Sequence, residues 1–424
     1  MPPPMPAERT PGLPVRRVTA RWRTASRARR AATNDGGAHP GKTGTSGPGG
    51  PMMLRRGLHL AEEAWDSLRL SFKRRTGLLG KPVLVPYRGL VAPGGVWVRG
   101  RVLEDQGVTT APHSESTLTN VWLTLKRYET DEIGGARIAW RALGKSGELV
   151  TDGEGYFDAV LPVEPADDAA PWFRVELELL SAPVHEVAPL AAELKVRTVS
   201  HQARFGVISD IDDTIVKTGA TNFVKHWRTV VANSAKSRTA FPGVSHLYRA
   251  FARDTAGPET NPVFYVSSSP WNLYDLFESF LALREIPLGP MLLKDFGLDG
   301  DKWLTGGHDD HKLTMIARIM EGYPRLSFVL IGDSGQRDAA IYAEAARRHP
   351  GRVLAVHIRD VTDGIFAEDA KAGLDALEAL GIPVTRGETL REAAASAEAM
   401  GLIDAADGES VRRAIADRER EDGV

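Results

Sequence analysis

The chain has no cysteine among its 424 residues, and it has no long apolar run. The lack of cysteine excludes disulfides, thiol nucleophiles and thiolate metal sites, so any bound metal must take oxygen or imidazole ligands. No stretch approaches the roughly 20 apolar residues that cross a bilayer. The first residues also lack the apolar region of a secretory signal. We therefore expect a cytoplasmic protein.

Charge of one sign is concentrated at the N-terminal end. Residues 1–75 hold 15 Lys and Arg against 5 Asp and Glu, so the rest of the chain is acidic although the total is only −2. A basic segment favours an anionic membrane surface or nucleic acid, or it is a solvated tail. Because residues 80–380 lack the basic, aromatic surface of a nucleic-acid binder, no nucleic-acid partner is expected.

Residues 1–79 divide into two parts. Residues 1–53 are rich in Pro, Gly and Arg without an apolar period, which predicts a disordered basic tail; Met52 and Met53 offer alternative translation starts. Residues 54–79 predict an amphipathic helix with basic flanks. Over 54–75 this helix suits peripheral contact with anionic lipid, or packing on its own protein. Its apolar stripe is Leu54, Leu58, Ala61, Trp65, Leu68 and Phe72.

Residues 80–200 have the pattern of a small antiparallel β-sandwich. The runs 96–102, 121–125 and 172–179 alternate apolar and polar residues, and 151–155 form a turn that leads into a further strand. Several short strands separated by turn residues are typical of such a domain. It carries no catalytic cluster, so we expect it to support the rest of the chain or to bind a partner.

From 201 to 384 the pattern becomes that of an α/β domain with a Rossmann-like parallel sheet. Continuous apolar runs alternate with segments of helical pattern, which predicts strands covered by helices on both faces. The sequence after 385 is rich in Ala and Glu and predicts a helical C-terminal segment, 385–424. The predicted strands are 204–208, 263–266, 328–331 and 353–356, and the helices include 244–253, 272–283 and 312–320.

Polar clusters follow three of these strands and open one helix. Ligands of parallel sheets bind where the strands end, so we expect the clusters to meet at one edge. Carboxylates from two strands can hold Mg²⁺, a lysine and a serine can bind phosphoryl oxygens, and an aspartate can attack phosphorus. The clusters are Asp210-x-Asp212-x-Thr214, Ser267-Ser268-Ser269-Pro270, Asp333 with Asp338, and Lys312.

These motifs resemble those of the haloacid dehalogenase-like phosphotransferases across 204–360. A nearer resemblance, over about 80–380, is to the actin-patch-protein type of phosphatidate phosphatase family. It is carried by Asp-Ile-Asp-Asp-Thr-Ile at 210–215, Tyr-Val-Ser-Ser-Ser-Pro-Trp at 265–271, Ile-Gly-Asp-Ser-Gly at 331–335, and the β-rich domain before them.

The resemblance implies a role for each motif residue. Asp210 would be the nucleophile that forms an aspartyl-phosphate, and Asp212 would protonate the leaving alcohol and then activate water. Ser267, Lys312 and Thr214 would bind the substrate phosphate. Mg²⁺ would be held by Asp210, Asp212 through its backbone carbonyl, and Asp333, with Asp338 supporting them.

Several residues also have simpler interpretations. A calcium loop starting at Asp210 is excluded, because its sixth position is Ile215 where Gly is needed and its twelfth is Thr221 where Glu is needed. Asp213 is a turn or capping residue, and Ser268 or Ser269 could replace Ser267. The remaining alternatives are a surface lysine at 312, a helix-start carboxylate at 338, and a polar loop or a metal cluster formed by His308, Asp309, Asp310 and His311.

The space between the motifs bears on the substrate. Fewer than 50 residues separate Thr214 from the strand at 263, and about 40 separate 271 from 312, so a large cap domain has no room. A weakly covered site suits a bulky substrate, and 222–228 mixes aromatic and basic residues as an interfacial element or a structural flap would. We expect a Mg²⁺-dependent phosphatase of phosphatidate or a related lipid phosphomonoester. The alternatives are a phosphatase of protein or polynucleotide ends and a non-catalytic membrane-associated scaffold.

Overall fold

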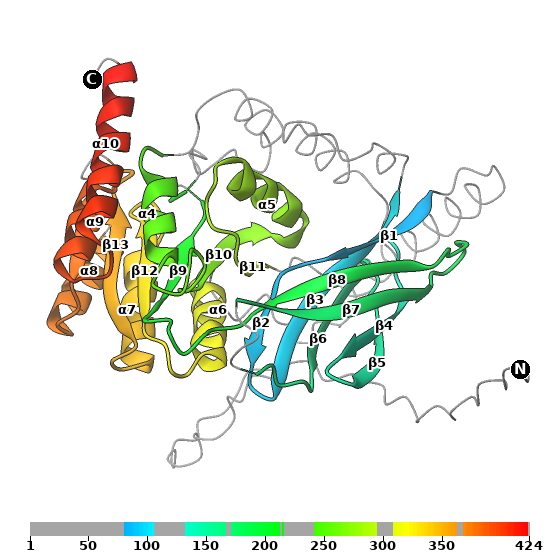
Figure 1. The fold of residues 1–424 in the computed structure, drawn as a ribbon. Helices are drawn as coiled ribbons and strands as arrows, with labels where there is room; N and C mark the ends of the chain where they lie inside the picture. Colours follow the sequence, from blue (N-terminus) through cyan, green and yellow to red (C-terminus); the bar gives the residue numbers. More distant parts are fainter. Residues whose placement is uncertain are drawn as a thin grey trace, which may run out of the picture.

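A computed structural model describes residues 80–105, 132–166, 171–212, 214–215, 241–294, 308–362 and 368–422. Two β-sheets lie side by side in it, and most of the described helices pack around one of them (Figure 1). The predicted mixed α/β class is therefore confirmed. The basic tail 1–53, the amphipathic helix 54–79, the strand at 121–125, Asp213 and the segment 222–228 all lie outside the described residues.

The first sheet has eight strands in the order β1-β3-β2-β8-β7-β4-β5, with β6 paired to β3. All pairs are antiparallel except β2 with β8. The predicted β-rich character is confirmed. Because the pairings join all strands in one sheet, its division into two layers stays a prediction. The strands are β1 (Lys81–Pro86), β2 (Gly89–Ala92), β3 (Gly95–Asp105), β4 (Arg137–Ala142), β5 (Lys145–Val150), β6 (Tyr156–Leu161), β7 (Trp172–Ser181) and β8 (Leu190–Arg197).

The second sheet has six strands in the order β11-β10-β9-β12-β13-β14, and every pair in it is parallel. Strands β9, β10, β12 and β13 are nearly continuous apolar runs because both faces are covered. This confirms the predicted parallel sheet. Its strands are β9 (Gly206–Asp210), β10 (Val263–Pro270), β11 (Met291–Lys294), β12 (Phe328–Asp333), β13 (Val353–Arg359) and β14 (Val384–Gly387).

Helices connect the parallel strands. Parallel crossovers are right-handed, so the reversal of strand order at β9 puts α4 on one face and α6, α7 and α8 on the other. The described helices are α4 (Val244–Ala252), η2 (Trp271–Leu273), α5 (Tyr274–Leu283), α6 (His308–Gly322), α7 (Asp338–Arg348), α8 (Glu368–Ala379), α9 (Arg391–Ala399) and α10 (Ala405–Asp422). Among them none is long and apolar enough to cross a membrane.

The C-terminal segment packs on the parallel sheet. Helices α9 and α10 make up most of it, but residues 385–387 belong to β14, so the predicted boundary between 384 and 385 falls inside a strand. Helix α9 contacts β14, and α10 contacts α4. Ala394, Ala397, Val411 and Ile415 belong to the same apolar core as the strands. Residues 385–422 therefore close one end of this domain.

The two sheets share one core at their junction. The core around β9 includes Leu90 and Trp97 from the first sheet. The hydroxyl of Tyr323, just after α6, accepts from the backbone N–H of Val91 at 3.0 Å and donates to the carbonyl of Arg197 at 2.6 Å. A Cβ on Gly322 would lie only 2.0 Å from the Val91 carbonyl oxygen, so the backbones of β2 and α6 meet there. The first sheet is thus fastened directly to the helix that begins near Lys312.

His357 makes stability depend on pH. It is buried in β13, its Nδ1 lies 2.7 Å from the Thr385 hydroxyl, and burial lowers its pKa from 6.5 to about 4. The unfolded state therefore takes up the proton first, and stability is lost as the pH falls from 6.5 towards 4. The loss at pH 4 is about 3 kcal/mol.

The test is urea unfolding of His357→Gln at pH 7 and pH 4. Glutamine can keep a hydrogen bond to Thr385 and does not titrate, so its deficit relative to wild type at pH 7 should shrink by about 3 kcal/mol at pH 4. The same deficit at both pH values would show that His357 does not contribute to acid sensitivity.

Candidate active site

Strands β9 and β12 each end on a buried aspartate. Asp210 is the last residue of β9 and Asp333 the last of β12, and neither is exposed to solvent. The two strands are neighbours in the middle of the sheet, so their carboxyl ends meet. The sequence thus brings two charged groups to the end of an apolar core, which is costly unless they have partners.

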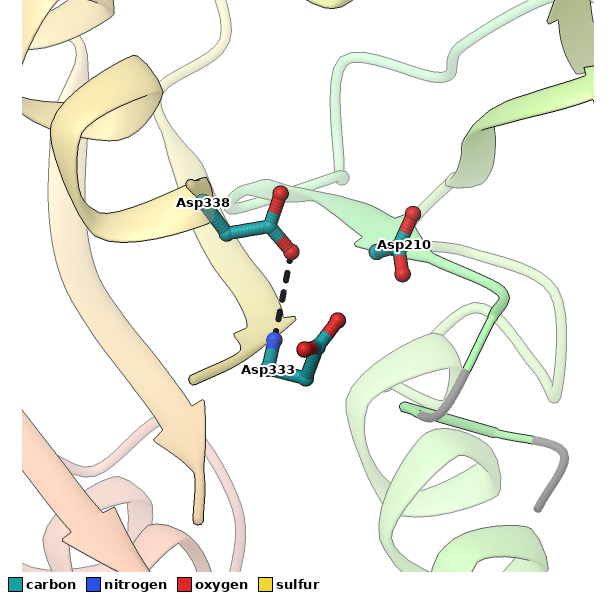
Figure 2. A group of neighbouring side chains, drawn as sticks. All are labelled: Asp210, Asp333 and Asp338. Carbon is teal, nitrogen blue, oxygen red and sulfur yellow. Dashed lines mark hydrogen bonds between the residues drawn. The ribbon is translucent and has the colours of Figure 1, made fainter. Parts of the chain in front are cut away.

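Asp338 completes a cluster of three carboxylates. It is the first residue of α7, and it is fully buried. Its Oδ2 accepts from the backbone N–H of Asp333 at 3.1 Å, and one oxygen from each of the three aspartates lies within 4.8 Å of the others (Figure 2). A Cβ on Gly332 would come within 2.3 Å of Asp338 Oδ2, so the close approach needs glycine. No other group of this kind occurs among the residues that the structure describes.

Lys312 on α6 neutralises part of this charge. Its Nζ lies 2.8 Å from Asp210 Oδ1 and also contacts Asp338 Oδ1, and the side chain is only 2% exposed. The two carboxylates raise the pKa of Lys312, so the ammonium stays charged despite its burial. With all four groups ionised, two net negative charges remain.

The pKa values of the clustered carboxyl groups reflect this excess of negative charge. Burial raises the pKa of Asp210 well above its usual value, against the opposing effect of Lys312. Burial and the neighbouring Asp338 raise the pKa of Asp333 to about 7. A group in this state takes up either a proton or a cation readily.

The donor set fits a hard divalent cation. Asp333 Oδ1 accepts from the backbone N–H groups of Gly335 and Gln336, at 2.7 and 2.9 Å. Asp333 Oδ2 is buried and has no hydrogen-bond partner among the residues that the structure describes. Carboxylate oxygens are the ligands that Mg²⁺ takes in proteins, and one divalent ion would cancel the remaining charge.

Asp212 lies beside the cluster and is held by two serines. Ser267 Oγ donates to Asp212 Oδ2 at 2.5 Å, and Ser269 Oγ lies 3.1 Å from the same oxygen. Ser267 Oγ also accepts from the N–H of Ser269 at 2.9 Å. The Asp212 side chain is not one of the three clustered carboxylates, so its predicted metal contact through the backbone carbonyl stays a prediction.

The predicted site residues thus converge on one edge of the sheet. Thr214 Oγ1 lies 3.5 Å from Asp210 Oδ2, a weak contact, and Ser267 is already engaged by Asp212. The predicted phosphate-binding roles of Thr214, Ser267 and Lys312 stay predictions, as does the catalytic role of Asp212. Of the alternative cluster at 308–311, the side chains of residues 308–310 lie outside the described set.

Sequence reasoning missed the support behind Asp210. Ser209 Oγ lies 2.6 Å from the hydroxyl of Tyr248 on α4 and donates to the Asp210 carbonyl at 2.7 Å. All three residues are buried. Because side chains alternate along a strand, the sequence predicts that Ser209 points to the opposite face of the sheet from Asp210. It does not predict that its partner is Tyr248 on α4.

A second missed group lies beyond Asp333. Ser334 Oγ donates to the Asp360 carboxylate at 3.1 Å and accepts from the N–H of Val361 at 2.9 Å. Ser334 lies in the Gly-Asp-Ser-Gly motif at 332–335, but no role is predicted for it from the sequence, and its partner just after β13 is known only from the fold.

Comparison with known proteins identifies the segment that carries the site. Residues 205–360 match the model described as "Phosphatidate phosphatase APP1, catalytic domain". Phosphatidate phosphatase APP1 of Saccharomyces cerevisiae is 33% identical over 155 residues, which are 36% of this chain and 25% of the yeast protein. An uncharacterised protein of Schizosaccharomyces pombe is 27% identical over 250 residues, which are 58% of this chain and 38% of that protein. The chain therefore spans well under half the length of these relatives.

Likeness to solved structures is weak. A β-D-glucuronidase of Dictyoglomus thermophilum aligns over 72% of this chain and 53% of its own, with 10% identity and a TM-score of 0.20. The match to the family model runs from β9 to β13 and includes every residue of the acidic cluster, so this segment is similar to the catalytic domain of phosphatidate phosphatase APP1.

Proposed function

We propose that this protein is a Mg²⁺-dependent phosphatase that acts through an aspartyl-phosphate intermediate on phosphatidate or a related lipid phosphomonoester. The observation that carries the proposal is the buried acidic cluster. Three carboxylates meet one lysine, and Asp333 Oδ2 has no hydrogen-bond partner within the described part of the chain. In an ion-pair network with a purely structural role the charges would balance. The acidic cluster has excess negative charge, so it can take up a cation together with an anionic group.

In the first step a carboxylate oxygen of Asp210 attacks phosphorus, and the bond from phosphorus to the alcohol oxygen breaks. The departing alkoxide takes a proton from Asp212 and leaves as the free alcohol. Asp212 becomes a carboxylate. Asp212 is suited to this because its carboxyl group is half-buried and aimed by Ser267 and Ser269. Lys312 next to Asp210 balances the negative charge of the phosphoryl group.

In the second step water attacks the phosphorus of the aspartyl-phosphate. Asp212, now a carboxylate, takes a proton from that water, and the bond between phosphorus and the Asp210 oxygen breaks. Inorganic phosphate leaves and both aspartates return to their starting states. Two easier displacements thus replace one difficult one.

Asp210 and Asp333, supported by Asp338, would hold the Mg²⁺. When bound, the ion would stabilise the negative charge that develops on the phosphoryl oxygens. The contribution of this chain is to keep the three carboxylates dry and close together.

The lipid substrate rests on similarity. The matching family and the yeast relative are both described as phosphatidate phosphatases. The resemblance of the motif order to haloacid dehalogenase-like enzymes supports the same chemistry. The short inserts leave room for a bulky substrate, and peripheral membrane association through 54–75 would bring the site to lipid.

The test is phosphate release by the purified full-length protein. Phosphatidate in mixed micelles is compared with soluble sugar and nucleotide phosphomonoesters, a phosphopeptide and a 5′-phosphorylated oligonucleotide. We expect release from phosphatidate in Mg²⁺, a loss of at least about a hundredfold in EDTA, and recovery when Mg²⁺ is restored.

Each other outcome has a distinct meaning. Release from the peptide or the oligonucleotide alone would keep the reaction and replace the substrate. No release from any substrate by folded, Mg²⁺-loaded protein would reject the enzyme and favour the scaffold. Release that is unaffected by EDTA would reject the role of the acidic cluster as a metal site.

A further inference from the structure

Trp271 directly follows the serine-rich end of β10, residues 267–270, and it packs against side chains of the first sheet. Its ring stacks on Tyr87 with a centroid distance of 5.5 Å and an interplanar angle of 11°. Trp97 lies 6.0 Å away in a tilted arrangement. Only 5% of Trp271 is exposed. The residue that follows the active-site strand β10 is therefore packed against aromatic side chains of the first sheet.

Arg99 of β3 provides the charged contact in that pocket. Its guanidinium carbon lies 4.3 Å from the centroid of the Trp271 ring and 4.9 Å from that of Tyr156. Asp158 holds the guanidinium group with a 2.7 Å ion pair and also accepts from Trp97 Nε1 at 2.9 Å. A buried guanidinium over an indole face is a strong form of cation–π contact, because little water competes for the charge.

The end of β10 before Trp271 is not fixed by the regular ladder of the sheet. Pairing of β10 with β11 is regular at Tyr265 and Val266 and then shifts before Pro270. Within the shifted stretch lie Ser267 and Ser269, the two residues that hold Asp212. Their geometry therefore depends on local hydrogen bonds and on where Trp271 is anchored.

We propose that Arg99 is a positioning residue for the phosphatase site. By holding Trp271, it sets the path of the end of β10, which aims Ser267 and Ser269 at Asp212. The inference rests on the proposed function, and it gives the first sheet a part in catalysis although that sheet supplies no reacting group. Small displacements of an acid–base residue lower turnover more than they weaken substrate binding.

The test compares two arginines of the same strand. Arg99→Gln removes the cation from Trp271. Arg101→Gln is the matched control, because Arg101 also lies over Tyr156, at 4.5 Å, and pairs with Glu132, but no contact with Trp271 is found for it. We expect Arg99→Gln to lower kcat about tenfold with KM within about twofold of wild type. Arg101→Gln should change both by less than about twofold.

A second readout does not need activity. Hydrogen exchange of the peptide that covers 267–271 should be faster in Arg99→Gln and unchanged in Arg101→Gln, since the Ser269 N–H is bonded to Ser267 Oγ. If Arg99→Gln does not fold, Asp158→Asn releases the same guanidinium without removing it and should change kcat and exchange in the same direction.

The outcomes separate the two proposals. Equal effects of the Arg99 and Arg101 variants, or a kcat loss without faster exchange at 267–271, would overturn the positioning role. If the wild-type chain releases no phosphate from any substrate, the proposed function is rejected. The comparison of hydrogen exchange at 267–271 would still decide whether Arg99 fixes the end of β10.

Discussion

Asp210→Asn is expected to lower phosphate release by about a thousandfold or more. The amide cannot displace an alcohol from phosphorus, although it has nearly the size and shape of the carboxyl group. Phosphate release from phosphatidate in Mg²⁺ measures the effect. Trapping of acid-stable phosphoryl label on the protein should disappear at the same time, because no aspartyl-phosphate can form.

The same variant should remain folded. Asp210 is one of three carboxylates that share one lysine, and its pKa is raised by burial. Removing its charge relieves repulsion while Lys312 keeps its contact with Asp338. We expect the thermal midpoint to change by no more than about 4 °C. A large fall would make lost activity uninformative.

Asp404→Asn is the matched control. Asp404 pairs with Arg253 at 2.9 Å and caps α10 through the N–H of Asp407, on the exposed surface. Its replacement should lower stability slightly and leave phosphate release within about twofold of wild type. More than a few per cent of wild-type turnover in Asp210→Asn would exclude Asp210 as the nucleophile.

Lys312→Met should cost both activity and stability. Methionine has a similar length, so packing is largely kept, but Asp210 and Asp338 lose their buried cation. Leaving buried charges without their partner costs about 3 to 5 kcal/mol. For a domain of this size we expect the thermal midpoint to fall by roughly 10 °C.

The direction of the pH effect identifies the cause. Without the lysine, repulsion and burial raise the carboxyl pKa values further, so the folded state binds protons more tightly than the unfolded state. The stability deficit of Lys312→Met should therefore shrink as the pH falls from 8 to 5. Mg²⁺ should also raise the midpoint of this variant, by occupying the acidic cluster.

A suitable control is Lys371→Met, which removes an exposed lysine from α8. It should change neither stability nor its pH dependence appreciably. A Lys312→Met deficit that stays constant from pH 8 to pH 5 would indicate lost packing instead of unbalanced carboxylates.

Much of the candidate site could be predicted because a parallel sheet has a simple geometry. A continuous apolar run predicts a strand buried on both faces, and parallel strands bring their carboxyl ends to one edge. Asp210, Asp333 and the serines each follow such a run, so their meeting follows from local pattern alone. Lys312 and Asp338 are predicted at helix starts in the same way. Asp338 is the first residue of α7, whereas α6 begins at His308, so Lys312 lies one turn inside its helix.

The hydrogen-bond partners could not be predicted. The sequence predicts that Ser267 binds the substrate phosphate; in the structure its hydroxyl donates to Asp212, and it lies where the β10–β11 ladder shifts. The bond of Ser209 to Tyr248 likewise depends on how α4 packs behind β9. Such contacts are set by distances of an ångström, which a pattern of residue types does not encode.

Domain boundaries were harder to predict from the sequence than these contacts. The sequence suggested a β-rich unit of its own, and its strands do form a separate sheet. The structure adds that Leu90 and Trp97 of that sheet join the core of the parallel sheet. Composition shifts mark where a pattern changes, but they do not show whether two units share a core.

The amino-acid sequence by itself determined the types of strand and helix and the chemistry of the acidic edge, because both follow from local apolar periodicity and from where charged residues interrupt it. Tertiary structure alone decided that Arg99 lies over Trp271, 172 positions away, and that three carboxylates share one lysine. It also left Asp333 Oδ2 without a hydrogen-bond partner among the described residues. The reason is physical. Long-range contacts are fixed by packing the whole chain into one core, whereas the local pattern constrains only neighbours along the chain.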